Sequence, residues 1–113
     1  MDEAEIKLTL RQKLILLLIS NNLDSEFRLI RLLDTADFPS ELGENLKVLL
    51  DHNLISVSEL AYNGTPLKYS TTKKGEESLR INNYHQEIIG YVKSMPNPEF
   101  LLKLVQIIIN KER

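Results

Sequence analysis

The apolar positions near the start of the chain predict a buried first helix. Residues 14–19 are apolar around the whole circumference of a helix, which is typical of a helix covered on most sides. Thr9 and Gln12 have the spacing of a capping box, so we expect the helix to begin directly after Thr9. The polar run at residues 20–22 is expected to end it.

Two further helices are predicted before residue 54. The second runs from residue 26 to about residue 34 after a cap at residues 24–25, and its core face is formed by Leu29, Ile30 and Leu33. The third opens around Pro39, which suits a first helical turn, and ends near Asn53, which tolerates a left-handed cap. Its core stripe consists of Leu42, Leu46, Leu49 and Leu50.

A β-hairpin is predicted to follow. Residues 54–60 and 67–71 are rich in β-branched or alternating apolar positions, and Asn63-Gly64 between them suits a two-residue turn. That turn would place Glu59 opposite Lys68 and Leu60 opposite Leu67, but it would set Tyr69 on the other face from Ile55 and Val57. A bulge would resolve the conflict, and the register stays open.

The remainder of the chain is predicted to be helical. Thr72 caps a short helix at residues 73–79, and apolar residues at helical spacing predict another helix at residues 84–93. Pro98, with Asn97 as the cap, opens a last helix from residue 99 to about residue 111.

Three short motifs resemble those of a known family. The motifs are L-x-x-L-L-x-x-x-L-I at residues 46–55, N-G-T-P at residues 63–66, and Tyr69, Thr72 and Gly75 in the spacing Y-x-x-T-x-x-G. They resemble the PadR-type and related bacterial winged helix-turn-helix transcriptional regulators, over roughly residues 9–81. The resemblance implies an α+β winged helix-turn-helix with additional C-terminal helices. Its domain would span residues 1–81, followed by a helical extension at residues 82–113.

Length and composition limit the class of protein. A chain of 113 residues has room for one domain with a modest core. The absence of cysteine excludes a disulfide framework, the first residues are acidic, and no apolar run is long enough to span a bilayer. We therefore expect a cytoplasmic protein with no membrane partner. The net charge of −2 means that any binding to nucleic acid must rest on a local patch.

The resemblance implies double-stranded DNA as a partner, with the third helix in the major groove and the hairpin as a wing. Phosphates would be met by lysines and arginines on the second helix, the third helix, the wing and the helix after it. The predicted contact residues are Arg28, Arg31, Ser40, Asn45, Lys47, Asn63, Gly64, Thr65, Lys68, Lys73 and Lys74.

The outward face of the third helix also supports a different reading. It carries three acids and one base, whereas a DNA-reading helix favours Arg and Lys. An interaction module of the winged-helix type could instead bind a protein through Glu41, Glu44, Val48 and Asp51. The two hypotheses stay open.

The last helix predicts a homodimer. Its apolar arc covers about 220° of the helical wheel, more than a core-facing stripe needs, so one side is expected to meet a second copy. The predicted dimer residues are Phe100, Leu101, Leu104, Val105 and Ile108, and the alternative is a helix inserted fully among its own neighbours.

No catalytic pattern is present in the sequence. His52 and His85 stand alone, and the chain has no zinc-protease, nucleophile-elbow, P-loop or dinucleotide-binding motif. We therefore expect no enzyme, no catalytic residues, no metal and no cofactor.

Overall fold

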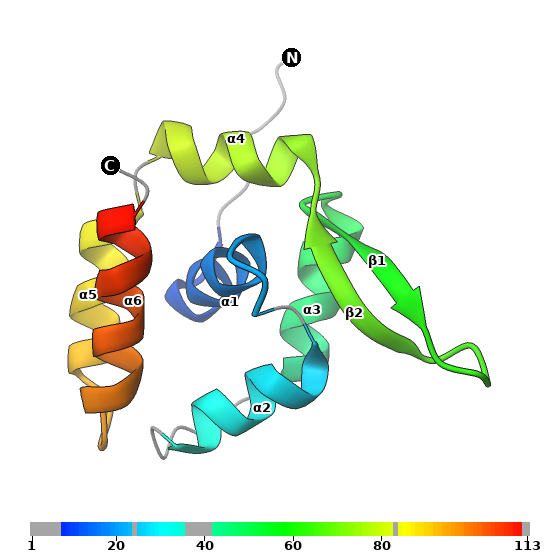
Figure 1. The fold of residues 1–113 in the computed structure, drawn as a ribbon. Helices are drawn as coiled ribbons and strands as arrows, with labels where there is room; N and C mark the ends of the chain where they lie inside the picture. Colours follow the sequence, from blue (N-terminus) through cyan, green and yellow to red (C-terminus); the bar gives the residue numbers. More distant parts are fainter. Residues whose placement is uncertain (1–7, 24, 36–41, 83, 112–113) are drawn as a thin grey trace.

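The computed structural model describes residues 8–23, 25–35, 42–82 and 84–111. Within these ranges the protein is an α+β structure of six helices and one two-stranded antiparallel hairpin, which confirms the predicted α+β class (Figure 1). The elements are α1 (Leu10–Ser20), α2 (Glu26–Thr35), α3 (Leu42–Asp51), β1 (Ile55–Leu60), β2 (Pro66–Thr71), α4 (Lys73–Asn82), α5 (His85–Lys93) and α6 (Glu99–Lys111).

Helix α1 forms the centre of the fold, and the other helices are arranged around it (Figure 1). Every residue from 14 to 19 is buried, as the uninterrupted apolar run predicts. The capping box is also confirmed, because the Gln12 amide donates to Thr9 Oγ1 over 3.1 Å and the Thr9 amide donates to Gln12 Oε1 over 3.0 Å. The first turn of α1 is thus fixed by two reciprocal hydrogen bonds.

Helix α2 buries Leu29 and Leu33, but Ile30 is 41% exposed. The prediction that Ile30 shares the core face was wrong. Successive residues on an α-helix are separated by about 100°, so Ile30 lies well to the side of a stripe centred on Leu29 and Leu33.

Helix α3 buries Leu42, Leu46 and Leu49 against the core, and Leu50 is half-buried. It ends as predicted with Asn53 in the left-handed region at φ 60°, where the Leu54 amide donates to Leu49 O over 2.9 Å. The predicted start around Pro39 lies outside the described residues.

The hairpin pairs Glu59 with Lys68, as a turn at Asn63-Gly64 requires, but Leu60 is opposite Pro66 and not Leu67. Register shifts lie on either side of Glu59, and the resulting irregularity brings Val57 opposite Tyr69. The predicted two-residue turn was wrong: the Gly64 amide donates to Ala61 O and the Ala61 amide to Thr65 O, which leaves three residues in the loop. Gly64 supplies the positive φ of 89° that such a loop needs at its last position.

The hairpin base is joined tightly to α4. The Thr72 amide donates to Leu54 O over 3.0 Å, its hydroxyl donates to Asn53 O over 2.6 Å, and Thr72 Oγ1 accepts from the Gly75 amide over 3.0 Å. A Cβ on Gly75 would lie 2.1 Å from the Leu54 carbonyl oxygen, so only glycine fits this approach. The prediction that Thr72 caps α4 is confirmed. The helix continues to Asn82, beyond the predicted end at residue 79.

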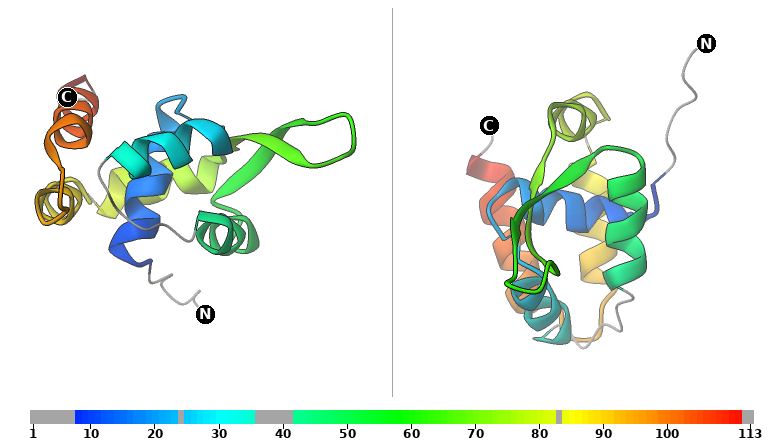
Figure 2. Two further views of the ribbon diagram at one scale, coloured as in Figure 1. Left: turned by 90° about the horizontal axis from the view of Figure 1, so that it is seen from below. Right: turned by 90° about the vertical axis from the view of Figure 1, so that its right-hand side faces the viewer.

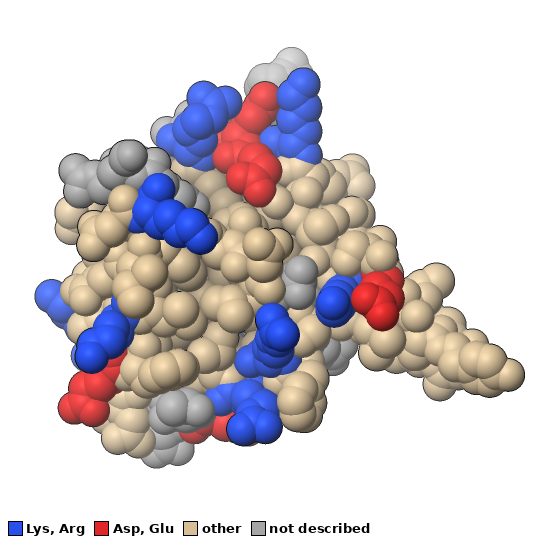
Figure 3. Space-filling view, viewed as in Figure 1, with Lys and Arg blue, Asp and Glu red and all other residues tan. Residues whose placement is uncertain are grey.

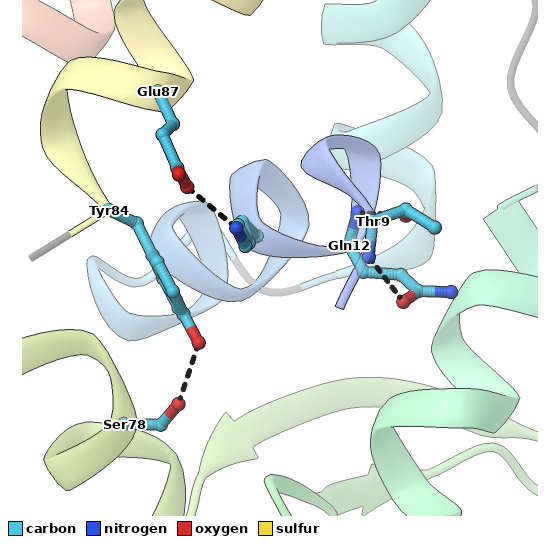
Figure 4. A network of polar contacts seen from close by, with 6 residues as sticks. Thr9, Gln12, Ser78, Tyr84 and Glu87 are labelled. Carbon is cyan, nitrogen blue, oxygen red and sulfur yellow. Dashed lines mark hydrogen bonds and ion pairs between the residues drawn. The ribbon is translucent and has the colours of Figure 1, made fainter. Parts of the chain in front are cut away.

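A polar network fastens α5 and α4 to α1 (Figure 4). Lys13 Nζ lies 2.6 Å from Glu87 Oε1 and 4.5 Å from the centre of the Tyr84 ring, and the Tyr84 hydroxyl is 3.2 Å from Ser78 Oγ. These contacts hold the start of α5 against α1 and α4.

Candidate nucleic-acid interface

Helix α3 and the hairpin lie on the same side of the fold, and the hairpin projects beyond the body (Figure 2). The exposed side chains of α3 are Glu44, Lys47 and Asp51, with Val48 half-buried beside them. Lys47 Nζ lies 3.2 Å from Asp51 Oδ2 in an exposed i,i+4 ion pair. Asp51 therefore partly neutralises the charge of Lys47, which weakens the attraction of Lys47 for a phosphate.

Asn45 is not available on this surface. It is only 8% exposed, and its Oδ1 accepts a 3.0 Å hydrogen bond from Gln12 Nε2. The prediction that Asn45 faces DNA was wrong. We had assigned Asn45 to the outward side of the helix because it is polar, but its hydrogen-bond partner Gln12 lies on α1. The Gln12–Asn45 hydrogen bond joins α1 to α3.

The wing residues lie at the end of the projecting hairpin or along its strands. Asn63, Gly64 and Thr65 are exposed at the tip, where Asn63 Oδ1 accepts from the Thr65 amide over 3.1 Å. Lys68 Nζ lies 3.7 Å from Glu59 Oε1, so this cation also has an acidic neighbour.

The hairpin exposes apolar side chains that sequence reasoning did not single out as a surface. These are Val57, Leu60, Tyr62 and Leu67. Val57, Leu60 and Leu67 lie on the two strands, and Tyr62 lies in the loop between them. The sequence does not show which strand positions other elements cover, and among the described residues no helix or strand covers the outer part of this hairpin.

The predicted cations on α2 and α4 are exposed. Arg28 and Arg31 lie on α2, where the Arg31 guanidinium carbon is 5.6 Å from the centre of the Phe27 ring. Lys73 and Lys74 form the first turn of α4. A bridge between Ser25 and Lys68 brings the start of α2 next to β2. Figure 3 shows basic side chains over α2 and over the base of the hairpin on one face of the molecule. On α4 the same figure shows basic and acidic side chains side by side.

The predicted dimer residues separate into two groups. Leu101, Val105 and Ile108 are at most 4% exposed and belong to the core of the protomer, so their prediction as a seam was wrong. Phe100 is 56% exposed, Leu104 is half-buried and Ile107, which was not predicted, is 57% exposed. A wide apolar arc does not reveal which side of the helix packs within its own protomer. Here α5 and α2 pack against α6, and the residues predicted to meet a second copy are buried.

A surface pocket lies between α2 and α6, with a volume of about 350 Å³. It is lined by Leu23, Arg28, Arg31, Leu32 and Phe100. In the part of the chain that the structure describes, no group of three or more acidic or histidine side chains could hold a metal ion.

No protein family, curated protein or solved structure matches the chain. The resemblance to winged helix-turn-helix regulators therefore stays a prediction. Among the described helices, none has both the length and the apolar character required to cross a bilayer. Ser40 and Glu41, predicted to contact DNA and a protein partner respectively, lie outside the described residues.

Proposed function

We propose that the chain is a winged helix-turn-helix protein that binds double-stranded DNA and acts in the cytoplasm as a dimeric transcriptional regulator. The observation that carries this proposal is the position of α3 beside a projecting hairpin on one side of the fold (Figure 2). A helix for the major groove and a wing for the flanking backbone are the two elements that this mode of binding requires.

The charges predict that phosphate contacts dominate the affinity. Arg28, Arg31, Lys68, Lys73 and Lys74 are exposed on α2, β2 and α4, whereas α3 itself offers only Lys47 together with two acids. Phosphate contacts give little sequence preference and weaken steeply as salt displaces them. The protein should therefore bind DNA weakly and in a salt-dependent manner.

The test is a titration of fluorescent random-sequence duplex at low and at physiological salt. We expect micromolar binding at low salt that weakens as salt rises, and the double variant Lys68→Glu/Lys73→Glu should lower affinity at least tenfold and flatten the salt slope. Lys93→Glu is the matched control, because Lys93 is an exposed lysine on α5, remote from the hairpin (Figure 1). Absence of binding even at low salt would reject the proposal.

The homodimer of this proposal uses the apolar side chains that α6 leaves exposed. Phe100 and Ile107 are seven residues apart, with half-buried Leu104 between them, so they share one flank of α6. An exposed stripe of this kind favours a second copy, since it would otherwise stay in water. Ile107→Glu should shift the mass measured by light scattering from dimer to monomer, and an unchanged mass would exclude this seam.

A second candidate function is binding of a protein partner, which the exposed apolar side chains of the hairpin favour. Tyr62 is fully exposed at the tip, and Leu60 is 60% exposed on β1. Glu44 and Asp51 are exposed on α3, which lies on the same side of the fold as the hairpin (Figure 2). Exposed apolar and acidic side chains on one side of the fold suit a basic amphipathic partner. A fluorescent basic amphipathic peptide should then bind the protein but not Val48→Asp or Tyr62→Ala variants, and equal binding by all three would remove this candidate.

A further inference from the structure

An acidic side chain lies beside a lysine on each of the two elements that the proposed function places on DNA. Lys47 Nζ lies 3.2 Å from Asp51 Oδ2 on α3, and Lys68 Nζ lies 3.7 Å from Glu59 Oε1 on the hairpin. The four side chains are between 50% and 75% exposed. A phosphate can therefore reach each lysine, and each lysine can leave its acid without any change in the core.

The Glu59–Lys68 pair depends on the irregular register of the hairpin. Val57 is opposite Tyr69. Regular antiparallel pairing would then place Ser58, the next residue, opposite Lys68. The register shift between Val57 and Glu59 brings Glu59 to that position instead. Opposite charges directly across two strands attract one another, so the backbone of the hairpin places an acid against its own lysine.

The ion pair between Lys13 and Glu87 has a different setting. Its Nζ to Oε1 distance is 2.6 Å, but the Lys13 side chain is only 16% exposed and packs over the Tyr84 ring. That pair joins α5 to α1. The pairs on α3 and the hairpin keep both partners in solvent, where an ion pair adds little to stability. Stability of the fold therefore gives little reason for either of them.

We propose that Asp51 and Glu59 compete with DNA phosphates for Lys47 and Lys68, and that they thereby set the non-specific affinity for DNA. This inference rests on the proposed DNA-binding function. A phosphate must displace the carboxylate to contact either lysine, and the carboxylate then lies unpaired next to the DNA backbone and repels it. Because phosphate contacts carry no sequence information, the two acids shorten the time that the protein spends on DNA of any sequence.

The experiment is a titration of the full chain and its variants with fluorescent random-sequence duplex at several salt concentrations. Asp51→Asn and Glu59→Gln remove the negative charge and keep the size of the side chain. Each should raise the affinity at low salt about two- to fivefold, the range expected for one exposed ion pair. Each should also steepen the plot of log K against log salt, by up to about 0.9 for the lysine that it frees.

The same substitutions in a background without the lysine separate competition from simple repulsion. Asp51→Asn should lose most of its gain in affinity when it is combined with Lys47→Gln. Glu59→Gln should likewise lose most of its gain when it is combined with Lys68→Gln. Glu44→Gln is the matched control on α3, because Glu44 is exposed and forms no ion pair with another described residue. Any gain from Glu44→Gln should be the same whether Lys47 is present or not.

All of the substituted side chains are exposed, so these variants should fold, and their thermal unfolding checks this. Equal gains with and without the lysines would overturn the proposal, because the acids would then act by repulsion alone. Duplex binding that is unchanged in Asp51→Asn and in Glu59→Gln would also overturn it and would leave the proposed function intact. Absence of duplex binding by the unaltered chain at low salt is a different result, since it rejects the proposed function and this inference together.

Discussion

Gln12 donates a 3.0 Å hydrogen bond from Nε2 to Asn45 Oδ1, and both side chains are 8% exposed. The same Gln12 accepts from the Thr9 amide through Oε1, so one side chain caps α1 and also fixes α3. A buried amide pair of this kind has directional requirements that an apolar contact lacks. The pair therefore sets the rotation of α3, and with it the side chains that α3 presents outward.

Replacing Asn45 with alanine should destabilise the protein by about 1–3 kcal/mol, because Gln12 Nε2 loses its partner in a buried position. Urea denaturation followed by circular dichroism measures this loss. The double variant Gln12→Leu/Asn45→Leu should lose less than the sum of the two single leucine variants. A lower affinity for DNA without any loss of stability would show instead that Asn45 is a contact residue.

Gly75→Ala should destabilise the fold by about 1–3 kcal/mol, because the new Cβ would overlap the Leu54 carbonyl oxygen and force the backbone to move. The matched control is Gly90→Ala in α5, where a Cβ meets no atom within 4 Å. This control should be stabilising by about 0.5–1 kcal/mol, since alanine is the better helix former. Thermal unfolding of the two variants should therefore shift in opposite directions, and equal shifts would contradict the close approach at Leu54.

Leu101→Ala should cost about 2–5 kcal/mol of stability, because the side chain is 1% exposed and its removal leaves a cavity. Ile107→Ala on the same helix should change the stability of the protomer by less than about 1 kcal/mol, since Ile107 is mostly in water. Chemical denaturation at low protein concentration, where a dimer dissociates, compares them. A larger effect of Ile107→Ala there would mean that the sides of α6 are interchanged.

Lys13→Ala should destabilise the protein more than Glu87→Ala. The Lys13 side chain is only 16% exposed and packs over Tyr84, so its removal loses apolar contact as well as charge. Glu87 is 54% exposed at its side chain, and an ion pair with one exposed partner contributes less than about 1 kcal/mol. Denaturation at low and at high salt tests this ranking, and Glu87→Ala should lose its small effect at high salt.

Local signals in the sequence were sufficient for much of the fold. The capping box at Thr9, the left-handed cap at Asn53 and the cap at Thr72 each depend on residues within a few positions, so short sequence words identify them. The burial of residues 14–19 follows in the same way, since none of these residues is polar.

The errors arose where the decision depends on distant residues. Asn45 is buried because Gln12, 33 positions earlier, supplies its partner. The covered side of α6 depends on where α2 and α5 lie, and a helical wheel of α6 alone carries no information about their positions. The irregular pairing of the hairpin compensates for a three-residue loop, and loop length changes the register of everything that follows it. The pocket between α2 and α6 is likewise a product of packing.

The anchoring of the hairpin at one end has a mechanical consequence. Its base is held by two donations from Thr72, to Leu54 O and Asn53 O, while the outer half has solvent around it. We therefore expect the base of the hairpin to be rigid and its tip to move. Amide hydrogen exchange should be slow at Thr72 and fast at Tyr62 and Asn63. The tip of the hairpin can then adjust to the curvature of the surface that it contacts without disturbing the packing around α1.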